Sequence, residues 1–272
     1  MAIWILTGLL LVALGGLLGP LAWQGVRRAR IAWRPFPPAW RDILRRRMPY
    51  FATMPADLQL QLKKHIQVLV AEKPFIGCAG LEVSEEMRVL VAAQAGLLLL
   101  NRNAGYFANL REVLIYPGAF VVDREQRDVA GLVREGRQVL SGESWQRGQV
   151  VLSWEDVLAG AADPGDGRNV VIHEFAHQLD QQSGPANGAP YLGRRERYVR
   201  WAATLGAAFA ELQQRVARGE PTLIDAYGAS DPAEFFAVAS EVFFERSQAL
   251  ADEQPALYRE LAGYYRVNPL SW

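Results

Sequence analysis

The stretch Val170–Asp180, "VVIHEFAHQLD", contains two of the three histidines in the chain. His173 and His177 stand four residues apart, and positions i and i+4 share one face of an α-helix. Their imidazoles can therefore converge on one point, as in H-E-x-x-H metal sites. The preceding "NVVI" is apolar, so we expect the helix to be buried in a folded domain and to hold its side chains rigidly. The stretch thus predicts a buried metal-binding helix.

Glu174, between the two histidines, adds chemistry to this pattern. Zinc accepts imidazole nitrogens at about 2.0–2.1 Å. A carboxylate one residue further round the helix does not ligate, but it reaches a water held on the metal, whose pKa is lowered to about 7. Glu174 is therefore predicted to be the catalytic general base. The alternative is a chance pattern on a core helix, which two histidines from a pool of three disfavour.

A hydrolytic zinc site needs a third protein ligand and leaves the fourth position to water. Glu234 follows the helix start Asp231-Pro232 by three residues, so it is either a ligand or a capping-box glutamate. Glu241 lies in an apolar run, which favours contact with a ligand histidine. Asp180, at the end of the first helix, favours a helix-end or supporting role. The residues alone leave these alternatives open.

The composition limits the classes of function. The chain has 272 residues, is 50% hydrophobic and has a formal net charge of zero, so it can bury a sizeable core. Residues 1–50 hold eight arginines and one acid, a balance of +7, and the remaining residues hold 21 bases and 28 acids, a balance of −7. Because the body of the chain is acidic, we expect no direct binding of nucleic acid. The single cysteine, Cys78, excludes an internal disulfide.

The N-terminal segment Ile3–Trp23 has 21 residues without a charge, enough to cross a bilayer core of about 30 Å as a helix. No basic segment precedes it and no cleavage site follows it, so we expect an uncleaved anchor rather than a signal peptide. All nearby arginines follow it, which places the body of the protein in the cytoplasm. We therefore predict a single-pass anchor of the inner (cytoplasmic) membrane at residues 1–26. A buried globular helix is the alternative.

The rest of the chain predicts an α+β fold. Residues 27–50 are rich in proline and arginine and are expected to form a basic juxtamembrane connector. His65, among lysines, is expected to be a lone surface histidine. A few strands are followed by a run of helices, the pattern typical of α+β domains. Strands are predicted within 110–122 and at 148–154, and helices at 57–72, 83–100, 169–180, 193–217, 232–247 and 253–265.

Five motifs in order carry a resemblance to a known family: "EVLIYPGAFVV", "SGESWQRGQVVLSW", "HEFAHQLD", "DAYGASDPAEFFAVASEVFF" and "YYRVNPL". Over nearly all of residues 40–270 the chain resembles the Mlc titration factor A family of zinc peptidases, which is similar to the catalytic domain of anthrax lethal factor. The resemblance implies a mainly helical, zincin-like metallopeptidase domain with a small β-sheet at residues 51–272. It also implies one Zn2+ per chain and a peptide or protein substrate.

The resemblance assigns further residues. The glutamate that begins E-F-F-A is the third zinc ligand of the family, which matches Glu234 and completes the set with His173 and His177. A tyrosine seven residues earlier matches Tyr227, whose phenol is then a hydrogen-bond donor to the oxyanion. The apolar segment at the N-terminus departs from the soluble members of the family.

The resemblance also supplies an alternative function. The family takes its name from members that sequester a transcriptional repressor, so the rival interpretation is a regulatory binding protein with weak or vestigial hydrolysis. Its partner would be a transcriptional regulator or another cytoplasmic protein. For the peptidase, the strand at 148–154 is expected to line the cleft and to align a peptide by edge pairing.

Overall fold

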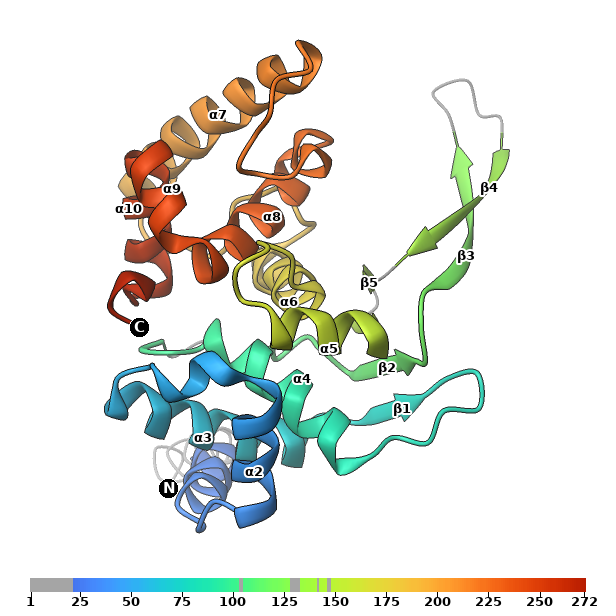
Figure 1. Ribbon diagram of the computed structural model, residues 1–272, viewed down its shortest axis with the longest axis vertical. Coiled ribbons are helices and arrows are strands. Elements are labelled where there is room, and N and C mark those ends of the chain that lie inside the picture. Colours follow the sequence, from blue (N-terminus) through green and yellow to red (C-terminus); the bar gives the residue numbers. More distant parts are fainter. Residues whose placement is uncertain (1–21, 103–104, 128–132, 141, 146–147) are drawn as a thin grey trace, which may run out of the picture.

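The computed structural model describes residues 22–102, 105–127, 133–140, 142–145 and 148–272. Helices predominate, and one connected hydrophobic core joins the N-terminal and C-terminal helices across a small sheet. In Figure 1 the helix α6 (Val170–Asp180) lies between the two groups of helices. The predicted α+β class, with a mainly helical domain and a small sheet, is confirmed.

The main sheet has the strand order β1-β2-β6-β5. The strands β1 (Phe75–Gly77), β2 (Glu112–Tyr116) and β6 (Gln149–Ser153) run parallel, and β5 (Gly142–Trp145) runs antiparallel to β6. The side chains of β2 alternate between half-buried and buried, and those of β6 are buried after its first residue. Both patterns are expected where helices cover a sheet. The sheet therefore lies inside the body of the protein.

The segment 110–122 contains two strands, as predicted. The first is β2, and the second begins β3 (Phe120–Arg127), which pairs with β4 (Val133–Leu140) in a separate antiparallel ribbon. The strand predicted at 148–154 is β6, but it is not an edge strand, because β2 and β5 flank it on both sides. The expected edge pairing of a peptide with β6 is therefore wrong. An added strand would pair with β1 or β5.

The N-terminal half is helical from residue 22 onward. Residues 22–32 are helical, and α2 (Pro38–Arg47), α3 (Ala56–Glu72) and α4 (Glu85–Leu97) follow. Ser84 caps α4 as predicted, with its hydroxyl accepting the Met87 amide at 3.2 Å. The prediction extended this helix to residue 100, but its last residues form turns instead.

Residues 27–50 contribute to the core. Ile31, Leu44 and Met48 are buried there. The guanidinium of Arg28 donates from Nε and Nη2 to the Glu72 carboxylate, which ties the first helix to α3. This basic segment therefore belongs to the packed body of the protein.

His65 differs from its predicted environment. It is half-buried on α3, and its Nδ1 lies 3.1 Å from the Tyr106 hydroxyl. Burial, together with the neighbouring Lys64, lowers the pKa of His65 to about 4. The helical spacing did not show this packing, because Tyr106 comes from a loop that is distant in sequence.

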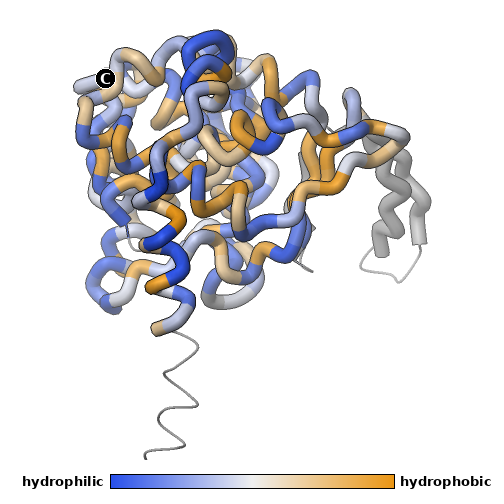
Figure 2. The backbone as a smooth tube through the Cα atoms, turned by 90° about the horizontal axis from the view of Figure 1, so that it is seen from below, coloured by the Kyte–Doolittle hydropathy of each residue, from blue (hydrophilic) through white to orange (hydrophobic). Residues whose placement is uncertain are grey.

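The C-terminal half is almost entirely helical. Its helices are α5 (Trp154–Ala162), α6, α7 (Arg195–Ala217), α8 (Pro232–Glu245), α9 (Ser247–Glu253) and α10 (Pro255–Tyr265). The four helices predicted in this half agree with α6, α7, α8 and α10 to within a few residues, whereas α5 and α9 were not predicted. Hydrophobic and hydrophilic segments alternate along the helices in Figure 2, as expected where one face of each helix packs into the core.

The predicted anchor, Ile3–Trp23, lies outside the described residues except for its last two positions. Among the residues from 22 onward that the structure describes, no helix combines the length and the apolar composition needed to cross a bilayer.

Candidate metal centre

Two capped helices carry the candidate site. Asn169 caps α6 through its side-chain oxygen, which accepts the Ile172 amide at 3.0 Å. Asp231 caps α8 by accepting the Ala233 and Glu234 amides at 2.8 and 3.0 Å, and Pro232 occupies the first helical position as predicted. The two helices pack against each other. The caps therefore fix the residues at which α6 and α8 begin, and with them the place of each side chain where the two helices pack together.

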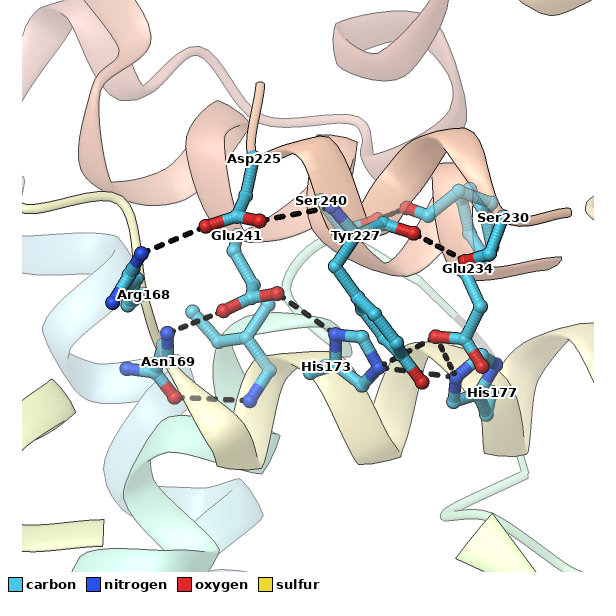
Figure 3. Close-up of polar contacts among 12 residues, drawn as sticks. Arg168, Asn169, His173, His177, Asp225, Tyr227, Ser230, Glu234, Ser240 and Glu241 are labelled. Atoms are coloured by element: carbon cyan, nitrogen blue, oxygen red, sulfur yellow. Dashed lines mark hydrogen bonds and ion pairs between the residues drawn. The ribbon is translucent and has the colours of Figure 1, made fainter. Parts of the chain in front are cut away.

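Three side chains converge between these helices (Figure 3). His173 Nε2 lies 3.0 Å from Glu234 Oε2, and His177 Nε2 lies 3.3 Å from the same oxygen. The two Nε2 atoms are 3.2 Å apart. Among the described residues these three form the group of histidine, cysteine and acidic side chains whose geometry suits a metal ion. Glu234 thus directs its carboxylate at the histidines, so its role is not that of a capping-box glutamate.

The donor set fits zinc. Three ligand atoms at about 2.0–2.1 Å from a tetrahedral ion lie about 3.3–3.4 Å apart. The observed separations of 3.0 to 3.3 Å are close to this value. Two imidazoles and one carboxylate leave one position of a tetrahedron open, whereas closed structural sites favour cysteine. The donor set therefore has the composition of an open metal site rather than a closed structural one.

Glu241 orients the first histidine. Its Oε1 lies 2.8 Å from His173 Nδ1, and its Oε2 accepts the backbone amide of Asn169 at 2.5 Å. A carboxylate at Nδ1 favours the tautomer with its proton there, which leaves the Nε2 lone pair for a metal. Glu241 therefore makes the contact with a ligand histidine that its place in an apolar run favoured.

Charge governs the protonation of the site. Burial alone would lower the pKa of His173, but hydrogen bonds to Glu234 and Glu241 outweigh it and raise this pKa well above its ordinary value. Burial would raise the pKa of Glu234, but the hydrogen bonds from His173 and His177 lower it. Without a metal, the carboxylates of Glu234 and Glu241 therefore favour a protonated His173.

The predicted catalytic residues flank this cluster. Glu174 is 3% exposed and follows the first ligand on α6. Tyr227 lies on the short helix η3 (Ala226–Ala229), with its ring centroid 6.1 Å from that of His173. Figure 3 shows its hydroxyl directed toward the space between His173 and Glu234. The residue is 54% exposed, so Tyr227 borders the solvent from which a substrate would arrive.

Asp180 stands apart from the metal-binding group. It is 1% exposed and ends α6. Its Oδ2 accepts the backbone amides of Asn187 and Gly188 at 2.8 and 2.7 Å, and burial raises its pKa. Asp180 therefore stabilises the loop that follows α6 by hydrogen bonding, in agreement with the helix-end role considered for it.

Sequence reasoning missed several supporting residues. Asn169 holds Glu241 through its backbone amide and Glu245 through its side chain. Arg168 pairs with Asp225, at 2.8 Å, and Asp225 caps η3 by accepting the Tyr227 amide. The sequence did indicate Glu245, because it follows Glu241 by four residues on an apolar helix and therefore shares the face of Glu241. No signal marked the Arg168–Asp225 pair, because its partners are 57 residues apart.

Comparisons with known proteins agree with this geometry. A family model described as glucose-regulated metallo-peptidase M90 matches residues 23–266. An uncharacterized protein of Synechocystis sp. is 39% identical over 249 residues, which cover 91% of this chain and 90% of the relative. Mlc titration factor A of Yersinia enterocolitica is 35% identical over 85% of this chain and 86% of the relative. The protein of the same name from Enterobacter sp. is 36% identical over 82% of this chain and 84% of the relative.

Proposed function

Because the chain belongs to the family of glucose-regulated metallo-peptidases M90, we propose that it is a zinc-dependent peptidase in which His173, His177 and Glu234 hold one Zn2+. One observation carries the proposal. Donor atoms from two helices, 61 residues apart in sequence, meet at the separations that zinc ligands require. Charged groups that are partly or fully buried, as these three are, need paired partners or a metal ion.

In the proposed hydrolysis of a peptide bond, each residue of the site has its own role. Zinc bound in such a site acts as a Lewis acid and lowers the pKa of a water in its open position. Glu174 takes the proton of the attacking water and delivers it to the leaving amine. Tyr227 donates a hydrogen bond to the scissile carbonyl oxygen as that oxygen gains negative charge. Glu241 keeps His173 in the tautomer that binds the metal.

The relatives named Mlc titration factor A support a second function for the same fold. In this alternative the chain sequesters a transcriptional regulator or another cytoplasmic partner, and hydrolysis is weak or vestigial. The intact Glu174 beside the ligands favours the peptidase, because binding alone does not require a general base.

The replacement Glu174→Gln tests the assignment. It keeps the shape of the side chain and removes its basicity, so we expect peptide hydrolysis to fall by about 10²-fold or more while Zn2+ stays bound. Cleavage of a peptide library and metal analysis by mass spectrometry measure the two properties. If the unmutated, zinc-loaded chain cleaves no peptide, the binding protein becomes the better assignment.

We also propose that residues 1–26 anchor the chain in the inner membrane with its catalytic domain in the cytoplasm. The support is the uncharged segment Ile3–Trp23 followed by arginines. Fractionation of cells that express the full chain tests this proposal. The protein is expected in membranes after alkaline washing, and its recovery in the wash would contradict the anchor.

A further inference from the structure

Asn169 joins three elements around the metal centre. Its side-chain oxygen caps α6, and its side-chain amide donates to the Gly160 carbonyl in α5 at 3.1 Å and to Glu245 Oε1 in α8 at 2.9 Å. Its backbone amide donates to Glu241 Oε2 at 2.5 Å. The residue is 1% exposed, so these bonds form in a nearly dry environment, where loss of a partner is costly.

Two backbone groups of Asn169 act on His173. The carbonyl of Asn169 accepts the backbone amide of His173 at 2.9 Å, which places the start of its helix turn. The amide of Asn169 holds Glu241, whose other oxygen meets His173 Nδ1 (Figure 3). The backbone and the imidazole of His173 are thus both set from one residue.

We propose that Asn169 is a positioning residue for the metal centre: its side-chain amide ties Gly160 on α5 and Glu245 on α8 to the start of α6. This tie keeps the backbone amide of Asn169 on Glu241, so that His173 presents Nε2 to the metal. The inference rests on the proposed zinc site. It goes beyond helix capping, because the side-chain amide donor contributes nothing to the cap.

Helix capping and positioning of the metal centre require different groups of the Asn169 side chain. Aspartate caps helices as well as asparagine does, but it has no N–H donor. At position 169 an aspartate would also place a third carboxylate beside Glu241 and Glu245. Burial already raises the pKa of Glu245 to about 8, with Asp166 and Glu241 acting in the same direction and the bond from Asn169 opposing them. A capping role therefore tolerates Asn169→Asp, and a positioning role does not.

The packing around Asn169 supports the need for a fixed position. A methyl group added to Gly160 would lie 3.1 Å from the Asn169 Cα, Cγ and Nδ2 atoms. Asn169 therefore packs closely against Gly160, at a place where a larger residue in α5 would displace it. The side chain is therefore held on one side by α5 and on the other by Glu245.

The test compares three variants of the full chain. Asn169→Asp keeps the cap, and Asn169→Ser keeps the cap and removes the donor without adding charge. Ser153→Ala removes the buried cap of α5, at the other end of this helix from Gly160. Zn2+ affinity is measured by competition with a chromogenic chelator. The visible absorption of the Co2+-substituted protein reports ligand geometry, and the Tm of the metal-free protein reports folding.

Replacements of this kind typically weaken metal binding by about 10–100-fold. We expect such a loss, with an altered Co2+ spectrum, in both Asn169 variants, and affinity equal to that of the unmutated chain in Ser153→Ala. At saturating zinc, kcat is expected to fall while KM stays unchanged.

Wild-type Zn2+ affinity and Co2+ spectrum in folded Asn169→Ser would overturn the inference, and this variant decides the matter if Asn169→Asp does not fold. Absence of Zn2+ binding by the unmutated chain would instead remove the proposed function itself. The two failures are therefore distinct.

Discussion

Zinc binding is expected to become weaker by about tenfold for each pH unit below neutrality. In the metal-free site both ring nitrogens of His173 face carboxylates, Glu234 at 3.0 Å from Nε2 and Glu241 at 2.8 Å from Nδ1. Each contact favours a proton on the nitrogen, which is why the pKa of His173 is raised. Zinc needs the lone pair of Nε2, so one proton must leave for each ion that binds. A tenfold change in affinity corresponds to about 1.4 kcal/mol.

The stability of the metal-free protein is expected to change in the opposite direction. His173 has a raised folded pKa, so its contribution is fully present below its unfolded pKa of about 6.5 and is lost as pH rises through the folded value. Glu234 has a lowered folded pKa, so its contribution is present above about 4.5 and is lost as pH falls through that lowered value. Both shifts describe one ion pair and are counted once. The metal-free Tm should therefore be highest near pH 5–6 and decline at higher pH.

Two assays examine this reasoning. Zn2+ dissociation constants between pH 6 and 8 come from chelator competition, and calorimetry in buffers of different ionisation enthalpy counts the protons released. The variant Glu241→Gln removes one of the two carboxylates, so the pH dependence should become shallower. A dissociation constant that does not vary across this range, with no proton released, would refute the argument, because His173 would then be neutral before zinc binds.

Three further outcomes are expected. Tyr227→Phe should lower kcat by about 10²–10³-fold with little change in KM, measured by peptide cleavage, and unchanged kcat would remove the oxyanion role. Arg168→Ala breaks an exposed ion pair with Asp225, so the free energy of unfolding should change by less than about 1 kcal/mol in urea titrations while kcat falls, because Tyr227 loses its support. Leu44→Ala empties a fully buried position in α2 and should cost about 2–5 kcal/mol in the same titrations, whereas Leu60→Ala, at a 53% exposed position, should cost almost nothing. Equal costs for the two leucines would show that residues 27–50 do not share the core.

The sequence predicted those parts of the site that depend on residues close together in the chain. The spacing of His173 and His177 and the helix start at Asp231-Pro232 are local features, and both appear in the structure as predicted. The choice of Glu234 over Glu241 needed the family resemblance, because helical spacing places both on roughly the same face of α8, and both contact His173 in the structure.

The errors have a common physical cause. The edge position assigned to β6 was wrong, because strand order depends on which distant segments pair, and β5 pairs with it from the other side. His65 was assigned to the surface, because its packing against Tyr106 joins residues 41 positions apart. Asn169 was placed inside the helix rather than at its cap, so the bonds that it makes to α5 and α8 were not foreseen. Non-local contacts leave little trace in sequence periodicity.

The distribution of the ligands over α6 and α8 has a consequence for folding. A metal ion bound to both helices is a removable cross-link that closes a loop of 61 residues between His173 and Glu234. In the chain-entropy treatment used for disulfides, a loop of this length corresponds to about 4 kcal/mol at 25 °C. The loop contains the 23-residue helix α7, and a protease cut within α7 should leave two fragments that separate far more readily after chelation than before it.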